Sequence, residues 1–155
     1  MKTVKSKRGF KATWYGVKTL FRIVAVGRPV TRDDAYDARV SLVEERVVLF
    51  KARSFSAAIR AAEREARRYA RYRYVNPYGQ SVVTRYLRAC DAFELFDPPG
   101  AGTEVFSSTE VISRRVSDRT VVNRRFGSIV NERADRQRRR NILNCELSGR
   151  APHKA

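Results

Sequence analysis

The chain contains few of the residues that build catalytic or metal centres. Among its 155 residues are one histidine, His153, and two cysteines, Cys90 and Cys145. A serine or cysteine nucleophile needs a base within hydrogen-bonding reach, and nothing holds a histidine so near the end of the sequence in place. Zinc needs about four sulfur or imidazole ligands, which these three residues do not supply at the usual spacing. The sequence therefore predicts no metal site, no cofactor and no Ser-His or Cys-His chemistry.

No stretch is apolar enough to predict a membrane span or a secretory signal. The most apolar run, VKTLFRIVAV at 17–26, is short and is interrupted by Arg22. The basic N-terminal stretch is not followed by an apolar core with a small-residue cleavage site, as a signal peptide would be. We therefore expect a cytoplasmic protein with reduced thiols and no membrane partner.

Carboxylates offer the remaining route to catalysis, as a metal-dependent nuclease. Neighbouring strand residues point to opposite faces, so Glu44 and Glu45 cannot hold one ion together. Asp97 and Glu104 flank the loop 98–102 and can approach each other, although such pairs are more often solvated or bound by arginine. The chain also lacks the G-x-x-x-x-G-K-[ST] phosphate loop. The sequence thus predicts a protein that is not an enzyme.

Positive charge dominates the chain, with 33 Lys and Arg against 16 Asp and Glu. Residues 1–11 hold five basic residues and no acid, and residues 114–155 hold twelve against four. Residues 12–113 are nearly balanced, apart from seven arginines and two glutamates at 53–73. This distribution predicts a basic arm at 1–11, a central domain at 12–113 and an arginine-rich extension at 114–155, and it favours a polyanionic partner.

The central domain has the pattern of four strands and one helix. Alternating and β-branched residues predict strands at 13–27, 39–52, 81–97 and 103–113. Ser54 is in position to cap the helix that follows the second strand. The order predicts an α+β fold, an antiparallel sheet of about four strands with one long helix packed on one face. We expect the extension after Ser113 to be partly helical or mobile, with Ser128 in position to cap a helix.

The predicted helix has two separate faces when its residues are placed 100° apart. The apolar stripe comprises Phe55, Ala58, Ile59, Ala62, Ala66 and Tyr69. The opposite side comprises Arg60, Arg64, Arg67, Arg68 and Arg71. Ordinary exposed faces mix charges of both signs, whereas only Glu63 and Glu65 intervene here, toward the flanks. The pattern predicts an amphipathic helix with an arginine ridge.

Residues 67–79, RRYARYRYVNPYG, combine four arginines with four tyrosines, a mixture typical of phosphate binding and base stacking. Tyr69 belongs to the apolar stripe, and residues 76–79 have the composition of a turn. Most of the aromatic residues are thereby assigned a structural role. Tyr72 and Tyr78 remain as lesser candidates for stacking.

Five segments occur in the order typical of a known family. They are WYGVKTLF (14–21), LVEERVVLFKARSFSAAIRAAE (42–63), NPYG (76–79), DAFELFD (91–97) and GTEVFS (102–107). Over residues 13–110 the chain resembles the bacterial domain of unknown function numbered 4288. The resemblance implies a compact α+β domain of bacteria or their phages and no known activity. The basic arm and the arginine-rich extension depart from the family pattern.

These features together predict a small nucleic-acid-binding protein, RNA ahead of DNA, that neutralises phosphates with arginine and has little base readout. The expected contacts are Arg60, Arg64, Arg67, Arg68, Arg71, Arg138, Arg139 and Arg140, with Tyr72 and Tyr78 stacking. The alternative is a protein-interaction module, antitoxin-like or immunity-like, whose helix or sheet edge binds an acidic protein partner. A continuous basic stripe would favour nucleic acid, and a basic patch around an apolar centre would favour a protein.

Overall fold

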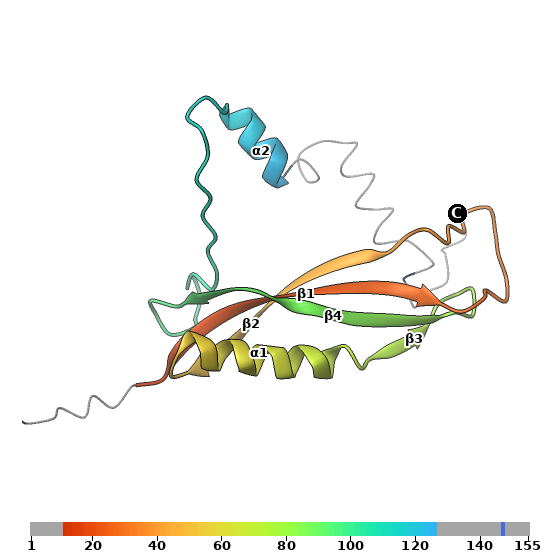
Figure 1. The fold of residues 1–155 in the computed structure, drawn as a ribbon, viewed down its shortest axis with the longest axis horizontal. Helices are drawn as coiled ribbons and strands as arrows, with labels where there is room; N and C mark the ends of the chain where they lie inside the picture. Colours follow the sequence, from red (N-terminus) through yellow and green to blue (C-terminus); the bar gives the residue numbers. More distant parts are fainter. Residues whose placement is uncertain (1–10, 127–146, 148–155) are drawn as a thin grey trace, which may run out of the picture. The chain divides into compact units, whose positions relative to one another are not determined.

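The computed structural model describes residues 11–126 and Leu147, which Figure 1 draws as the coloured ribbon. In chain order its elements are β1 (Thr13–Val26), β2 (Leu42–Ala52), α1 (Phe55–Tyr69), β3 (Arg73–Val75), β4 (Ser81–Glu94) and α2 (Asp118–Phe126). The strands form one sheet in the order β2-β1-β4-β3. The predicted α+β class with an antiparallel sheet is confirmed.

The fourth strand is not the segment that the sequence predicted. Residues 103–113 lie outside every strand, and the edge position beside β4 belongs to the three residues of β3. Arg73, Tyr74 and Val75 pair antiparallel with residues 83, 82 and 81, so that a tight turn joins β3 to β4. Loop length does not decide between the two pairings, because five residues separate β3 from β4 and five separate the predicted strands 81–97 and 103–113. The difference lies in the contacts: hydrogen bonds of the Asn76 side chain hold the turn before β4, whereas the backbone of Val105 packs against Gly16 on the face of the sheet.

The prediction of one long helix is not confirmed, because the described residues contain two helices, α1 of 15 residues and α2 of 9. Arg138, Arg139, Arg140 and Ser128 lie outside the described residues.

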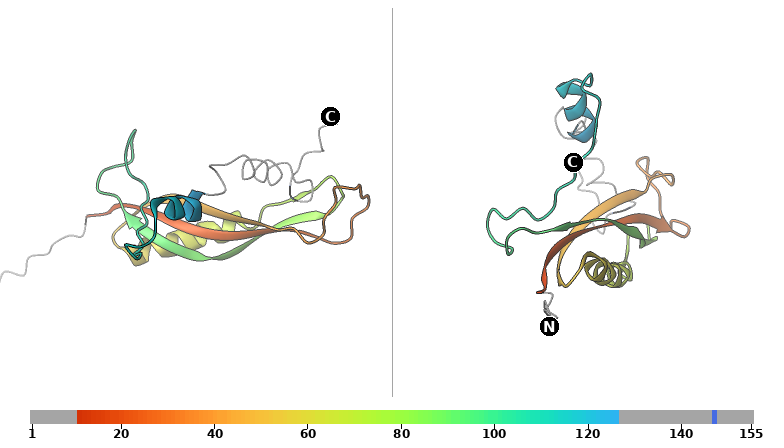
Figure 2. Two further views of the ribbon diagram at one scale, coloured as in Figure 1. Left: turned by 90° about the horizontal axis from the view of Figure 1, so that it is seen from above. Right: turned by 60° about the vertical axis from the view of Figure 1, so that its left-hand side comes forward.

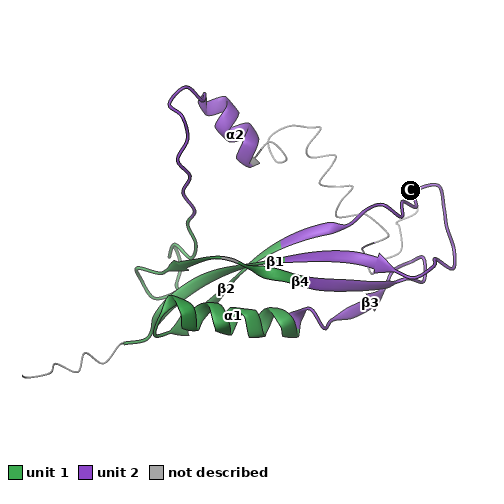
Figure 3. Ribbon diagram, viewed as in Figure 1, with its two compact units in different colours: residues 1–20, 45–68, 86–107 green, residues 21–44, 69–85, 108–155 purple. Residues whose placement is uncertain are grey.

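The chain divides into two compact units, coloured separately in Figure 3. Unit 1 comprises residues 1–20, 45–68 and 86–107. Unit 2 comprises residues 21–44, 69–85 and 108–155. The strands β1, β2 and β4 each contribute residues to both units.

In unit 1, α1 covers one face of the sheet, as Figures 1 and 2 show. Tyr15 and Val17 of β1 point to this face and form a buried cluster with Ala58 and Ala62 of α1. The alternation predicted for β1 and the apolar stripe predicted for the helix are therefore confirmed. Ser54 caps the helix as predicted, since its hydroxyl oxygen accepts a hydrogen bond from the Ala57 amide at 3.2 Å.

The opposite face of the sheet in unit 1 is partly covered by the segment 103–107. The carbonyl oxygen of Val105 comes so close to Gly16 on β1 that a Cβ atom there would lie 2.0 Å from it. The Phe106 ring centroid lies 6.4 Å from that of Phe93 and 4.6 Å from the Lys18 ammonium. The stretch that the sequence predicts as a strand therefore lies against the sheet instead of extending it.

We expect Gly16→Ala to destabilise the protein by about 1–3 kcal/mol, because the new methyl group overlaps a backbone atom and forces the segment 103–107 outward. Urea denaturation followed by circular dichroism measures the loss. Gly100→Ala is the matched control, since its Cβ would meet no atom closer than 3.8 Å. An unchanged midpoint for Gly16→Ala would show that this segment does not lie on the sheet in solution.

In unit 2 the turn at 76–79 is held by buried hydrogen bonds. The Asn76 side-chain oxygen accepts from the amides of Tyr78 at 3.1 Å and Gln80 at 2.8 Å. The Gln80 amide side chain donates to the Gly27 carbonyl at 2.7 Å, and Gly79 has a φ of 77°, in the region that favours glycine. The predicted turn is confirmed, and these bonds tie it to the end of β1.

Candidate functional site

The helix α1 carries four exposed arginines on the side away from the sheet: Arg60, Arg64, Arg67 and Arg68. We call these four the arginine face. The spacing of Ala58, Ala62 and Ala66 places these three residues on one side of the helix, and their burial against the sheet fixes the rotation of the helix. The arginines therefore face away from the sheet. Arg71, which the sequence groups with them, follows the helix by two residues, belongs to unit 2 and is also exposed.

The acidic neighbours of the arginine face are directed elsewhere. Glu65 forms an ion pair with Arg46 of β2 at 3.3 Å, and the Glu65 and Arg46 side chains are only 20% and 24% exposed. Glu63 is half-buried. Within the described residues no carboxylate forms an ion pair with a member of the arginine face. The outer side of α1 therefore presents positive charge that its own acids do not neutralise.

One member of the arginine face also has a structural contact. The Arg67 guanidinium lies 5.6 Å from the ring centroid of Tyr86 on β4, a cation–π distance. Arg67 and Arg68 occupy the last turn of α1, where positive charge stabilises the helix dipole. Arg60 and Arg64 have no such role and are the clearest candidates for binding.

The two tyrosines proposed for stacking differ in their surroundings. Tyr72 is 67% exposed, with its ring centroid 6.0 Å from that of Tyr74, so its ring remains accessible. Tyr78 is only 4% exposed, and its hydroxyl donates a hydrogen bond to Asp33 at 2.8 Å. The stacking role predicted for Tyr78 is therefore wrong, because its ring packs edge-on against Tyr36 inside unit 2.

The carboxylates do not converge within the described part of the chain. No group of three or more His, Cys, Asp or Glu residues there is placed to hold a metal ion. Asp97 and Glu104 are both exposed. Within residues 11–126, no third acid joins them in a group that could hold a metal ion.

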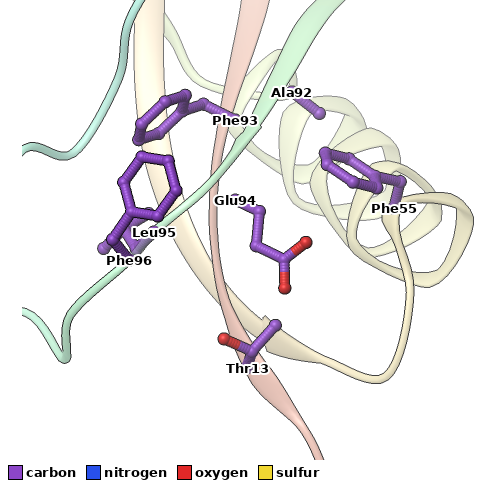
Figure 4. Close-up of a pocket in the computed structure, with 7 residues that line it drawn as sticks. All are labelled: Thr13, Phe55, Ala92, Phe93, Glu94, Leu95 and Phe96. Carbon is purple, nitrogen blue, oxygen red and sulfur yellow. The ribbon is translucent and has the colours of Figure 1, made fainter.

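Unit 1 also has a pocket at the end of its sheet, which Figure 4 shows. The rings of Phe93 and Phe96 lie on one side of β4, and the Glu94 carboxylate points to the other side, toward Thr13 and Phe55. Burial, and secondarily the negative charge of Glu94, raise the pKa of the nearby Tyr15 hydroxyl. The Phe55 ring packs edge-on against Tyr15, with centroids 4.9 Å apart.

A second, adjoining pocket combines aromatic rings with lysines. It shares Thr13, Leu95 and Phe96 with the first and is also lined by Lys11, Trp14, Lys51 and Asp97. Sequence reasoning missed it because its residues come from three distant segments. The one local signal is Phe96, an aromatic residue of the predicted strand 81–97 that lies two positions past the end of β4.

A family model described as a domain of unknown function (DUF4288) matches residues 14–107. No curated protein and no solved structure matches the chain. None of the helices in the described residues has the length and apolar character needed to cross a membrane.

Proposed function

The chain belongs to the DUF4288 family, whose description names no activity, and we propose from its own geometry that it binds nucleic acid through the arginine face of α1. The observation that carries the proposal is the set of four exposed arginines on one helix, none of which forms an ion pair with an acid among the described residues. Arg60, Arg64 and Arg68 carry most of it, because the Arg67 guanidinium also packs over Tyr86. From Arg60 to Arg68 the helix rises about 12 Å, at 1.5 Å per residue. Over that length one strand of a duplex presents three to four phosphates, at about 3.4 Å each.

The mechanism we propose is phosphate neutralisation with release of counterions, and it involves no catalysis. Guanidinium groups suit this task because their charge is permanent and their donors match phosphate oxygens. Arg71 and Tyr72 follow α1 directly in the chain and are included as further contacts. Arg138, Arg139 and Arg140 are proposed to add charge from the extension. The ligand class is RNA ahead of DNA, in the cytoplasm of a bacterium.

The protein-interaction alternative rests on different surfaces. The four arginines of α1 are exposed, whereas its alanines are half-buried or buried, so its exposed surface is more basic than apolar, which favours nucleic acid. The observation that favours a protein partner is β2, one of the two edge strands of the sheet, whose outer side pairs with no other strand of the described residues. An added strand there would bond to the backbone and would not need the arginine face.

Binding of a labelled, mixed-sequence RNA over a salt series tests the proposal. If the full chain contacts five to eight phosphates, log K should fall against log[salt] with a slope of roughly −4 to −7. Fluorescence anisotropy at salt concentrations from roughly 50 to 300 mM measures this slope.

Two outcomes would contradict the proposal. Weak binding with a slope near zero would mean that phosphates are not the ligand. Displacement of RNA by a polyglutamate peptide at equal charge concentration would instead favour an acidic protein partner.

A further inference from the structure

We propose that the pocket lined by Lys11, Trp14, Lys51 and Phe96 binds an unpaired nucleobase together with its phosphate, which would make single-stranded nucleic acid the preferred ligand. The inference rests on the proposed function, which it deepens by naming the ligand class. It is carried by a different part of unit 1 from the arginine face.

The first argument is the exposure of Phe96. Its side chain is 86% exposed, although it is wholly apolar and lies beside Leu95, which is only 4% exposed. Phe93 contacts its ring edge-to-face, with centroids 5.8 Å apart, which orients Phe96 without covering it. An oriented, uncovered ring is what base stacking uses, because every base has a π face.

The second argument is the rigid backbone of the pocket. The Leu95 amide donates to the Trp14 carbonyl at 2.9 Å, which joins the end of β4 to β1 beside both aromatic residues. Pro98 and Pro99 come two and three residues after Phe96, and the Pro98 carbonyl accepts a hydrogen bond from the Thr103 hydroxyl at 3.0 Å. Proline fixes φ at positions 98 and 99, so with the two hydrogen bonds it reduces the freedom that the chain on either side of Phe96 loses when a ligand binds.

The third argument is the charge at the rim. Lys11 and Lys51 are both exposed and lie beside the aromatic residues, in position to bind a phosphate. Residues 1–11 contain no acid, so the positive charge continues along the sequence before Lys11. Asp97 can accept a hydrogen bond from the amino group of a base. The volume, about 300 Å³, is at the lower end of ligand pockets and suits one small planar group.

The chain's single tryptophan, Trp14, provides the direct test. The full chain is titrated with a single-stranded RNA of about ten nucleotides and, separately, with the same sequence as a perfect duplex. We expect the single strand to quench Trp14 emission and the duplex to bind without quenching. Phe96→Ala should weaken single-strand binding roughly 5- to 100-fold, the range found for loss of one stacked base.

Further variants separate the possible failures. Phe96→Leu keeps the apolar bulk and should still weaken binding, whereas Val111→Ala, at a fully exposed position, should not. This inference would be overturned if single strand and duplex bind equally, Trp14 emission does not change and the Phe96 variants bind as tightly as the unchanged protein. The proposal for the arginine face would then be unaffected. If replacing Arg60, Arg64 and Arg68 by glutamate leaves single-strand binding intact while Phe96→Ala removes it, the proposed role of α1 fails and the pocket stands. No binding of either RNA would overturn both.

Discussion

Reversing three charges of the arginine face, in the variant R60E/R64E/R68E, is expected to reduce RNA affinity at least 100-fold near 0.1 M salt. Each lost phosphate contact lowers the magnitude of the slope of log K against log[salt] by about 0.7–0.9, so the loss of three contacts lowers it by about 2–3. At 0.1 M salt this smaller slope corresponds to an affinity lower by about 2–3 decades. The three glutamates add repulsion to this loss. Arg67 is left in place because its guanidinium packs over Tyr86.

The triple variant should remain folded. All three side chains are exposed and none forms an ion pair with a described carboxylate, so Arg60→Glu and Arg64→Glu should each change stability by roughly 0.5 kcal/mol or less. Arg68→Glu reverses a charge in the last turn of α1 and should cost about 1 kcal/mol. Circular dichroism and a urea melt verify the fold, and anisotropy over the salt series measures both affinity and slope.

A second triple variant, R22E/R28E/R114E, is the matched control. It changes the net charge equally at exposed arginines outside α1. We expect it to lose less than about tenfold in affinity at the same salt, because it removes only long-range attraction. If both variants lose affinity equally, the binding follows net charge, and the claim for the arginine face is wrong.

Replacing Asn76 by alanine is expected to cost about 2–4 kcal/mol of the free energy of unfolding. Its side-chain oxygen accepts from the backbone amides of Tyr78 and Gln80, and all three residues are buried. Without it, two buried donors lose their acceptor, at about 1–3 kcal/mol each, offset in part by relaxation of the turn. The Asn76 amide group also donates to the Gln80 side chain at 3.2 Å.

Urea denaturation of Asn76→Ala measures this loss, and for a domain of this size the melting temperature should fall by roughly 10 °C. Asn123→Ala, at an exposed position of α2, is the control and should change stability by less than about 0.5 kcal/mol. A midpoint for Asn76→Ala that matches this control would mean that water replaces the lost acceptor. The turn would then not be the buried element that the structure describes.

The features that depend on near neighbours in the chain follow from the sequence. The rotation of α1 follows from the spacing of Ala58, Ala62 and Ala66, because 3.6 residues per turn place them on one side whatever the rest of the fold does. The Ser54 cap, the alternation of β1 and the turn at 76–79 are local in the same sense. The direction of the arginine ridge was therefore predictable, and four of the five residues predicted for it lie on α1.

The tertiary structure alone decided what each segment pairs with. The stretch 103–113 has the composition of a strand, but composition carries no information about a partner, and β3 occupies the place beside β4. Tyr78 and Tyr72 are close in sequence and similar in context, yet Tyr78 is buried, with its ring against Tyr36 and its hydroxyl bonded to Asp33, whereas Tyr72 is exposed. Lys11, Lys51 and Phe96 form one pocket because three strand ends meet there. Contacts between residues 40 or more positions apart depend on the whole chain, and no local pattern encodes them.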